Sequence, residues 1–137
     1  MTAQSSLRST LRALPVFAVR VAARGFDDVP DDPHRLFTDW LGGAIDVGEP
    51  EPHAMTLSTC GEDDLPDARV LILKDLDPTG WWFATSSLSA KGRQLEVRPG
   101  AALTFHWKSL ARQVRVRGRV SPAPRNASTY RVRDGTR

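Results

Sequence analysis

The chain has 137 residues, of which 40% are hydrophobic and 26% are charged, so it can form one folded domain with a core and is not a wholly disordered protein. Its single cysteine, Cys60, excludes an internal disulfide and a cysteine-based metal cluster, and no apolar run approaches the length of a membrane span. The formal net charge is +3, but arginines gather towards both ends while carboxylates dominate residues 27–64. This asymmetry favours an anionic partner near the basic segments.

Residues 1–31 are predicted to form a basic N-terminal arm, and residues 32–137 a single domain. The first 24 residues contain four arginines and no acidic residue. Arg20 and Arg24 interrupt the apolar patch of this segment, so we interpret it as the arm of a cytoplasmic protein and not as a secretory signal.

A helix is predicted at the start of the domain. Asp32 is a favourable N-cap, and Pro33 suits the first turn. Apolar side chains then recur at helical spacing, namely Leu36, Phe37, Trp40 and Leu41. The glycine pair at 42–43 weakens the far end of this helix.

Five strands and one short helix are predicted after the first helix. The strands are expected at residues 53–60, 68–76, 81–86, 101–108 and 111–122, with the helix at 87–100. The fifth strand alternates, with Val114, Val116 and Val120 on one face and arginines on the other. Residues 124–137 are expected to begin a final helix. Closely spaced strands joined by turns favour a small antiparallel barrel.

Two cations lie at the ends of the second strand. Arg69 and Lys74 are five residues apart, so in an extended strand their side chains leave opposite faces and cannot clamp one anion together. They can serve two neighbouring anionic groups, or one ligand and a partner subunit. Ser89 and Lys91 lie near the start of the second predicted helix, where unpaired N–H groups and the helix dipole favour a phosphate.

Two polar side chains add to this constellation. Thr85 offers a hydroxyl at the end of the third strand, and Gln113 offers an amide that both donates and accepts, as the edge of a heteroaromatic ring requires. The pattern therefore predicts a site for a phosphorylated small molecule.

Three ordered motifs, RVLILK (69–74), FATSSLSAKGRQL (83–95) and LARQVRVRG (110–118), resemble the N-terminal two-thirds of the pyridoxamine 5′-phosphate oxidases. The resemblance implies a mainly β fold with flanking helices, the FMN-binding split β-barrel, antiparallel and Greek-key-like. The family continues for several dozen residues, so the barrel is expected to be incomplete at the C-terminus, with an open strand edge. The resemblance also implies a homodimer with FMN at the subunit interface.

The resemblance assigns roles residue by residue. The strand Arg69, Val70, Leu71, Ile72, Leu73 and Lys74 would line the flavin, with Arg69 towards the FMN phosphate and Lys74 towards the phosphate of a pyridoxal-type substrate. The other implied cofactor contacts are Ala84, Thr85, Ser89, Lys91 and Gln113. Tyr130 and Arg133 fall near the family's Tyr and Arg that hold the substrate phosphate. No residue is assigned a catalytic role, and no metal is expected.

The leading hypothesis is an FMN-dependent oxidase of the pyridoxamine/pyridoxine 5′-phosphate type. It would transfer a hydride from a B6 vitamer to flavin and reoxidise the flavin with O2, in vitamin B6 metabolism. One alternative is an FMN-binding module without turnover, because the family's C-terminal catalytic segment is absent. A second is a basic small barrel that binds nucleic acid through its arginines, which the lack of interleaved exposed aromatics argues against. The basic tail also raises the possibility of a truncated product.

Overall fold

The computed structural model describes residues 6–16, 29–85, 94–95, 98–123 and 126–134. The elements in chain order are α1 (Leu7–Ala13), α2 (Pro33–Asp46), β1 (Ala54–Cys60), β2 (Pro66–Asp77), β3 (Gly80–Ala84), β4 (Gly100–Trp107), the 3-10 helix η1 (Lys108–Leu110), β5 (Arg112–Ala123) and β6 (Asn126–Asp134). None of the helices in these ranges is long and apolar enough to cross a membrane.

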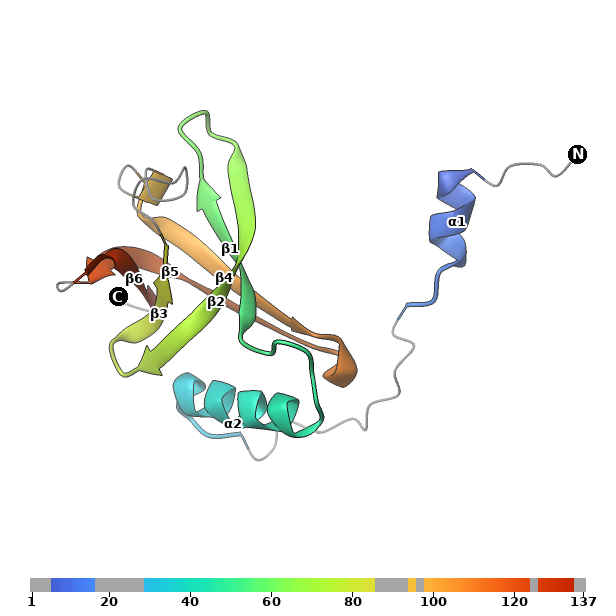
Figure 1. The fold of residues 1–137 in the computed structure, drawn as a ribbon, viewed down its shortest axis with the longest axis horizontal. Coiled ribbons are helices and arrows are strands. Elements are labelled where there is room, and N and C mark those ends of the chain that lie inside the picture. The colour runs from blue at the N-terminus through green and yellow to red at the C-terminus, as the bar shows by residue number, and fades with distance from the viewer. Residues whose placement is uncertain (1–5, 17–28, 86–93, 96–97, 124–125, 135–137) are drawn as a thin grey trace, which may run out of the picture.

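The six strands of the described residues close into a barrel in the order β1-β2-β3-β6-β5-β4 (Figure 1). Every neighbouring pair is antiparallel. β1 pairs with both β2 and β4, so the sheet leaves strict chain order at that point. The mainly β, antiparallel barrel predicted from the sequence is confirmed.

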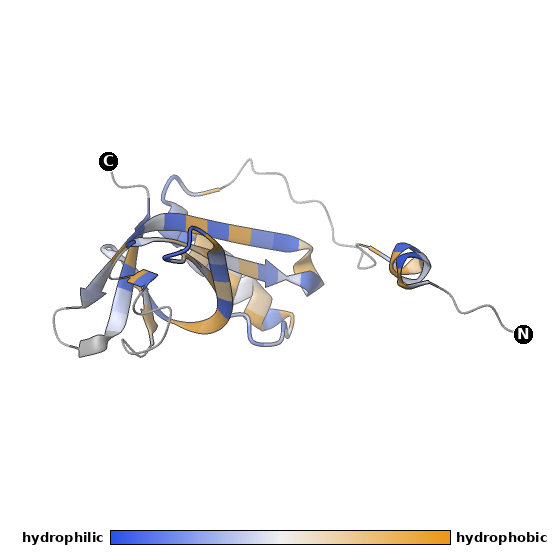
Figure 2. Cartoon of the chain, turned by 90° about the horizontal axis from the view of Figure 1, so that it is seen from above, coloured by the Kyte–Doolittle hydropathy of each residue, from blue (hydrophilic) through white to orange (hydrophobic). Residues whose placement is uncertain are grey.

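The strands form because apolar and polar side chains alternate along them, which places one set inside the barrel (Figure 2). Met55, Leu57, Leu103 and Phe105 are fully buried, as are the aromatic rings of Phe83 and Trp107. On β5, Val116 and Val120 are buried while Arg115, Arg117 and Arg119 are exposed, as the alternation predicts. Burial of this apolar interior is the main force that holds the barrel together.

Helix α2 covers one end of the barrel, below the strands in Figure 1. Asp32 caps it by accepting a hydrogen bond from the His34 backbone N–H at 3.0 Å, as predicted. The buried ring of Phe37 meets three barrel rings, with centroids 4.6 Å from Trp81, 4.8 Å from Phe105 and 5.7 Å from Trp107. His34 Nε2 lies 2.9 Å from Asp134 Oδ1, which ties the helix to the last strand.

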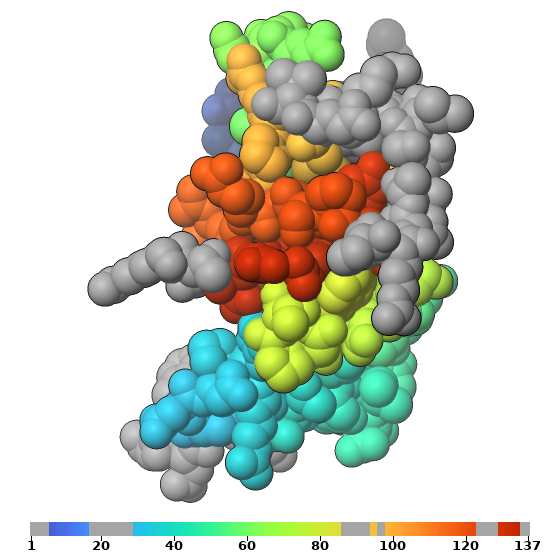
Figure 3. Space-filling view, turned by 90° about the vertical axis from the view of Figure 1, so that its left-hand side faces the viewer, coloured from blue at the N-terminus to red at the C-terminus, as the bar shows by residue number. Residues whose placement is uncertain are grey.

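The last described segment is a strand, so the predicted final helix is wrong. In β6, buried Tyr130 and Val132 alternate with Arg131 and Arg133, a period of two that suits a strand. β6 lies between β3 and β5 and pairs with each of them along one of its two edges (Figure 3). The expected open edge is also wrong, because this closure satisfies the backbone groups that an edge would leave unpaired.

Two predicted segments fall partly outside the described residues. Within the N-terminal arm, α1 buries none of its residues. Within the predicted helix at 87–100, Gln94 and Leu95 are helical and Leu95 is buried, as expected. Gly100, the expected end of that helix, is the first residue of β4.

Replacing Gly42 or Gly43 with alanine is expected to stabilise the protein by about 0.5–1 kcal/mol each. Both glycines lie inside α2, and a Cβ at either position would meet no atom within 4 Å. Alanine restricts the unfolded chain without a steric cost in the helix. Urea denaturation of the two single variants would measure the gain, and a loss of stability in either would show that this segment is not a regular helix.

Candidate functional site

Strand β2 presents two different faces at the predicted site. Leu71 and Leu73 turn towards the core, whereas Val70 is 67% exposed on the outer face. Ile72 lies on the same outer face and is half-buried. A register shift between Leu73 and Asp75 interrupts the pairing with β3 at Lys74, whose side chain is exposed. The outer face of β2 is thus an apolar strip that ends in a cation.

Arg69 lies on the inward side of β2 and is fully engaged. Its Nη1 donates to Thr59 Oγ1 at 2.7 Å and to the Leu57 carbonyl at 3.2 Å. Its Nη2 lies 3.0 Å from Asp67 Oδ2. The sequence prediction that Arg69 and Lys74 leave opposite faces of the strand is confirmed. A ligand phosphate at Arg69 would compete with the Asp67 carboxylate already bound there.

Gln94 is the third side chain around Arg69, with Thr59 and Asp67. It accepts a hydrogen bond from the Thr59 hydroxyl and donates to Asp67 Oδ2 at 3.3 Å. The pKa of Asp67 is lowered, first by the Gln94 amide and also by the Arg69 charge. Sequence reasoning missed Thr59, Asp67 and Gln94. Asp67 could have been found, because it stands two residues before Arg69 and therefore shares its strand face.

The end of β3 carries the next predicted contacts. Ala84 is exposed and Thr85, directly after the strand, is buried at 9% exposure. Phe83 pairs with Leu73 of β2, and both are buried, so Thr85, two residues further on, lies on the core side, whereas exposed Ala84 lies on the outer side beside the strip. Ser89 and Lys91 lie outside the described residues.

Gln113 lies on the far side of the barrel from β2. It is the second residue of β5, pairs with His106 of β4 and is exposed. In the closed order of strands, two strands separate β5 from β2 in either direction, β1 and β4 one way and β3 and β6 the other. An outward Gln113 therefore cannot reach a ligand on the outer face of β2 of the same chain.

Tyr130 and Arg133 do not come together as a phosphate clamp. Three residues apart on β6, they leave opposite faces of the strand. Tyr130 is 4% exposed, and its ring stacks on Phe83 at 5.8 Å inside the barrel. Arg133 is exposed outside, opposite Arg119 of β5.

The turn between β2 and β3 is built on Asp77. Its Oδ1 accepts from the backbone N–H groups of Thr79 at 2.7 Å and Gly80 at 3.2 Å, and from the Thr79 hydroxyl. Its Oδ2 accepts from the Trp82 indole N–H at 2.8 Å. These bonds lower the pKa of Asp77, with the Thr79 hydroxyl as the largest cause.

We expect the stability given by Asp77 to depend on pH. A carboxyl with a lowered pKa stabilises the fold fully above its unfolded value, about 3.9 for Asp, and loses that effect as the pH falls through the folded pKa. Asp77→Asn should therefore be less stable than the parent at about pH 5 to 7, and the gap should shrink below about pH 3.9. Urea unfolding at constant ionic strength would measure this, and a gap that does not change with pH would contradict it.

Solved structures define the class of this barrel. PhzG from Burkholderia lata 383, solved in complex with tetrahydrophenazine-1-carboxylic acid, matches 77% of this chain and 52% of its own at 31% identity and a TM-score of 0.71. A pyridoxamine 5′-phosphate oxidase-related, FMN binding protein from Nostoc punctiforme PCC 73102 matches 69% of this chain and 51% of its own at 18% identity and a TM-score of 0.60. The fold is the split barrel of FMN-binding proteins of the pyridoxamine 5′-phosphate oxidase type.

Sequence comparison gives the family. The family model described as pyridoxamine 5′-phosphate oxidase matches residues 43–135. The pyridoxine/pyridoxamine 5′-phosphate oxidase of Azorhizobium caulinodans is 57% identical over 90 residues, which are 66% of this chain and 42% of that protein. The chain belongs to the pyridoxamine 5′-phosphate oxidase family, and it spans less than half the length of this curated relative.

Proposed function

We propose that the protein binds FMN and acts as an oxidase on a phosphorylated B6 vitamer. The observation that carries the proposal is the exposed apolar strip of β2 that ends at Lys74, within a chain 57% identical to a pyridoxine/pyridoxamine 5′-phosphate oxidase over the matched region. A bound flavin would supply the redox chemistry by taking a hydride from the substrate and passing electrons to O2.

The described residues fit the ring of a flavin and the phosphate of its substrate. Val70 and Ile72 offer an open apolar surface for a flat ring, and Lys74 offers an exposed cation for a substrate phosphate. Exposed Ala84 borders this surface at the end of the adjacent strand, while the buried Thr85 lies on the core side. The flavin phosphate needs further donors, since Arg69 is already paired with Asp67. Ser89 and Lys91 are the residues that we propose for this role.

The proposed site requires two copies of the chain. Gln113 and the β2 strip lie on opposite sides of one barrel, so both can touch one flavin only if β5 of one copy faces β2 of another. A twofold dimer would form two such sites. Val70, an apolar side chain 67% exposed, is the kind of residue that such an interface covers.

Titration of the full chain with FMN tests the cofactor. We expect saturable quenching of flavin fluorescence at one FMN per chain, and binding of riboflavin, which lacks the phosphate, at least about tenfold weaker. Protein that takes up neither flavin would remove the proposal. Product formation from pyridoxamine 5′-phosphate with consumption of O2 then tests turnover.

We expect Lys74→Gln to raise the KM for the phosphorylated substrate by about tenfold or more, because one charge-assisted hydrogen bond is lost. The affinity for FMN should change little. Lys74 is exposed and has no ion-pair partner among the described residues, so folding should not suffer. Steady-state kinetics would measure the effect, with Lys108→Gln, another exposed lysine, as the matched control. An unchanged KM would remove Lys74 from the substrate site.

A flavin-binding module without turnover is the second candidate. It is favoured by the length of the matched region, which is 42% of the Azorhizobium relative. Stoichiometric FMN binding without product under saturating substrate would select it over the oxidase.

A further inference from the structure

A groove of about 860 Å³ lies over β1, β4 and β5, and residues 69–74, Thr85 and Gln113 do not line it. Its floor consists of small residues, namely Ser58, Gly100, Ala101, Ala102 and Gly118. Larger side chains at these positions would fill the hollow. The volume is within the range of sites for small organic ligands.

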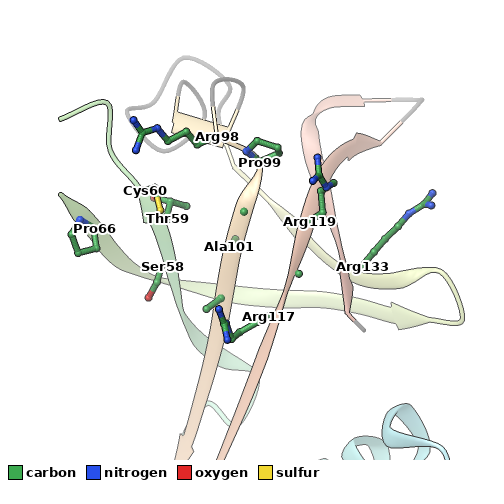
Figure 4. Close-up of a pocket in the computed structure, with 13 residues that line it drawn as sticks. Ser58, Thr59, Cys60, Pro66, Arg98, Pro99, Ala101, Arg117, Arg119 and Arg133 are labelled. Atoms are coloured by element: carbon green, nitrogen blue, oxygen red, sulfur yellow. The ribbon is translucent and has the colours of Figure 1, made fainter. Parts of the chain in front are cut away.

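Four arginines line this groove, and they come from separate parts of the chain (Figure 4). Arg117 and Arg119 project from β5, Arg133 from β6, and Arg98 from the segment before β4. Arg98 pairs with the Asp64 carboxylate, which raises its pKa. The other three have no hydrogen-bond or ion-pair partner in the part of the chain that the structure describes.

Two of these arginines, Arg119 and Arg133, repel each other when no anion lies between them. Arg119 and Arg133 stand directly opposite each other in the register of β5 and β6, and both are exposed. Like charges directly opposite on neighbouring strands destabilise a sheet. A solvated basic strand face would explain an arginine stripe on β5, but it would not explain the hollow beside it or the contributions of β6 and of Arg98.

We propose that this groove, which we call the arginine groove, binds a small ligand carrying two or more phosphate groups. One guanidinium group can donate two parallel hydrogen bonds to the oxygens of a phosphate. Of the four arginines that line the groove, only Arg98 is paired with a carboxylate among the described residues. The described lining contains no aromatic side chain, whereas single-stranded nucleic acids are held by stacking on aromatic rings. The volume and the charge therefore select a compact polyphosphate over a strand of nucleic acid.

The test uses the full chain and inorganic pyrophosphate and tripolyphosphate as probes, by calorimetry at constant ionic strength. We expect saturable binding at one site per chain, tighter for tripolyphosphate. The double variant Arg117→Gln with Arg119→Gln should weaken it by about 100-fold, roughly tenfold for each arginine. Arg115→Gln is the matched control, because Arg115 is exposed on the same face of β5 but does not line the groove. It should change the affinity by less than about twofold.

Two further measurements test whether pyrophosphate binding needs the shape of the groove or only its positive charge. Ala102→Leu keeps every arginine but fills the floor, so it should weaken pyrophosphate binding by about tenfold or more. Cys60 lines the groove and is the chain's only cysteine. Saturating pyrophosphate should therefore slow its alkylation by iodoacetamide at least about fivefold in the parent and in Arg115→Gln, but not in the double variant.

Several results would overturn the proposal. They are the absence of saturable binding, equal weakening in Arg115→Gln and the double variant, or a single-stranded oligonucleotide that binds more tightly than tripolyphosphate. FMN affinity distinguishes this site from the proposed flavin site, since it should be unchanged in the double variant. A parallel loss of FMN and pyrophosphate binding would show that the groove holds the flavin phosphate and is not a separate site. The melting temperature of each variant, expected near that of the parent, verifies folding.

Discussion

Replacing Gly118 with alanine is expected to destabilise the barrel by about 3 kcal/mol or more, and so to remove a large part of the stability of a domain of this size. A Cβ at this position of β5 would lie 2.0 Å from the Arg133 carbonyl oxygen and 2.7 Å from its carbonyl carbon, both backbone atoms of β6. No side-chain rotation can relieve such a contact, so the two strands would have to separate. Overpacking against side chains alone costs about 1–3 kcal/mol.

Gly100→Ala is the matched control for Gly118→Ala. Gly100 lies on β4, which pairs with the other edge of β5, and a Cβ there meets no atom within 4 Å. Its stability should stay within about 0.5 kcal/mol of the parent. Urea denaturation followed by tryptophan fluorescence would measure both variants. If Gly118→Ala were as stable as Gly100→Ala, β6 would not close the barrel against β5.

Mixing two inactive variants is expected to restore flavin binding. In the proposed dimer each flavin contacts β2 of one copy and Gln113 of the other. Val70→Asp places a carboxylate on the exposed strip of β2, and Gln113→Glu removes the amide donor from β5, so each should weaken FMN binding by about 100-fold. Both positions are exposed, so neither change should unfold the chain.

A heterodimer of these two variants contains one intact site and one doubly damaged site. After unfolding and refolding of an equimolar mixture, half of the dimers should be mixed, which gives about 0.25 high-affinity FMN per chain. Each variant alone should give close to none at the same concentration. Sites formed within single chains predict no recovery, because every chain in the mixture carries a damaged site. Fluorescence titration measures the stoichiometry, and size-exclusion chromatography shows whether dimers form.

The sequence predicted the barrel because local patterns carry the relevant physics. Alternation of apolar and polar residues determines which side of each strand enters the core, and turn residues mark where the strands end. The helix α2 was equally readable, since Asp32, Pro33 and the apolar spacing all agree. The last segment was predicted wrongly, although Tyr130 and Val132 alternate with arginines there. Its strand is stabilised by pairing with β5, which directly precedes it in the chain, and with β3, which is distant in sequence.

For the candidate site too, the sequence determined some features and the tertiary structure decided others. The sequence alone determined that Arg69 and Lys74 leave opposite faces of one strand, and the motifs around them determined the family. Only the tertiary structure decided that Arg69 is paired with Asp67, that Tyr130 is a core residue, and that Gln113 lies across the barrel from β2. It also brought Arg98, Arg119 and Arg133 to one groove. The physical reason is that a strand's own faces follow from its period, whereas the neighbours of each face depend on how the barrel closes.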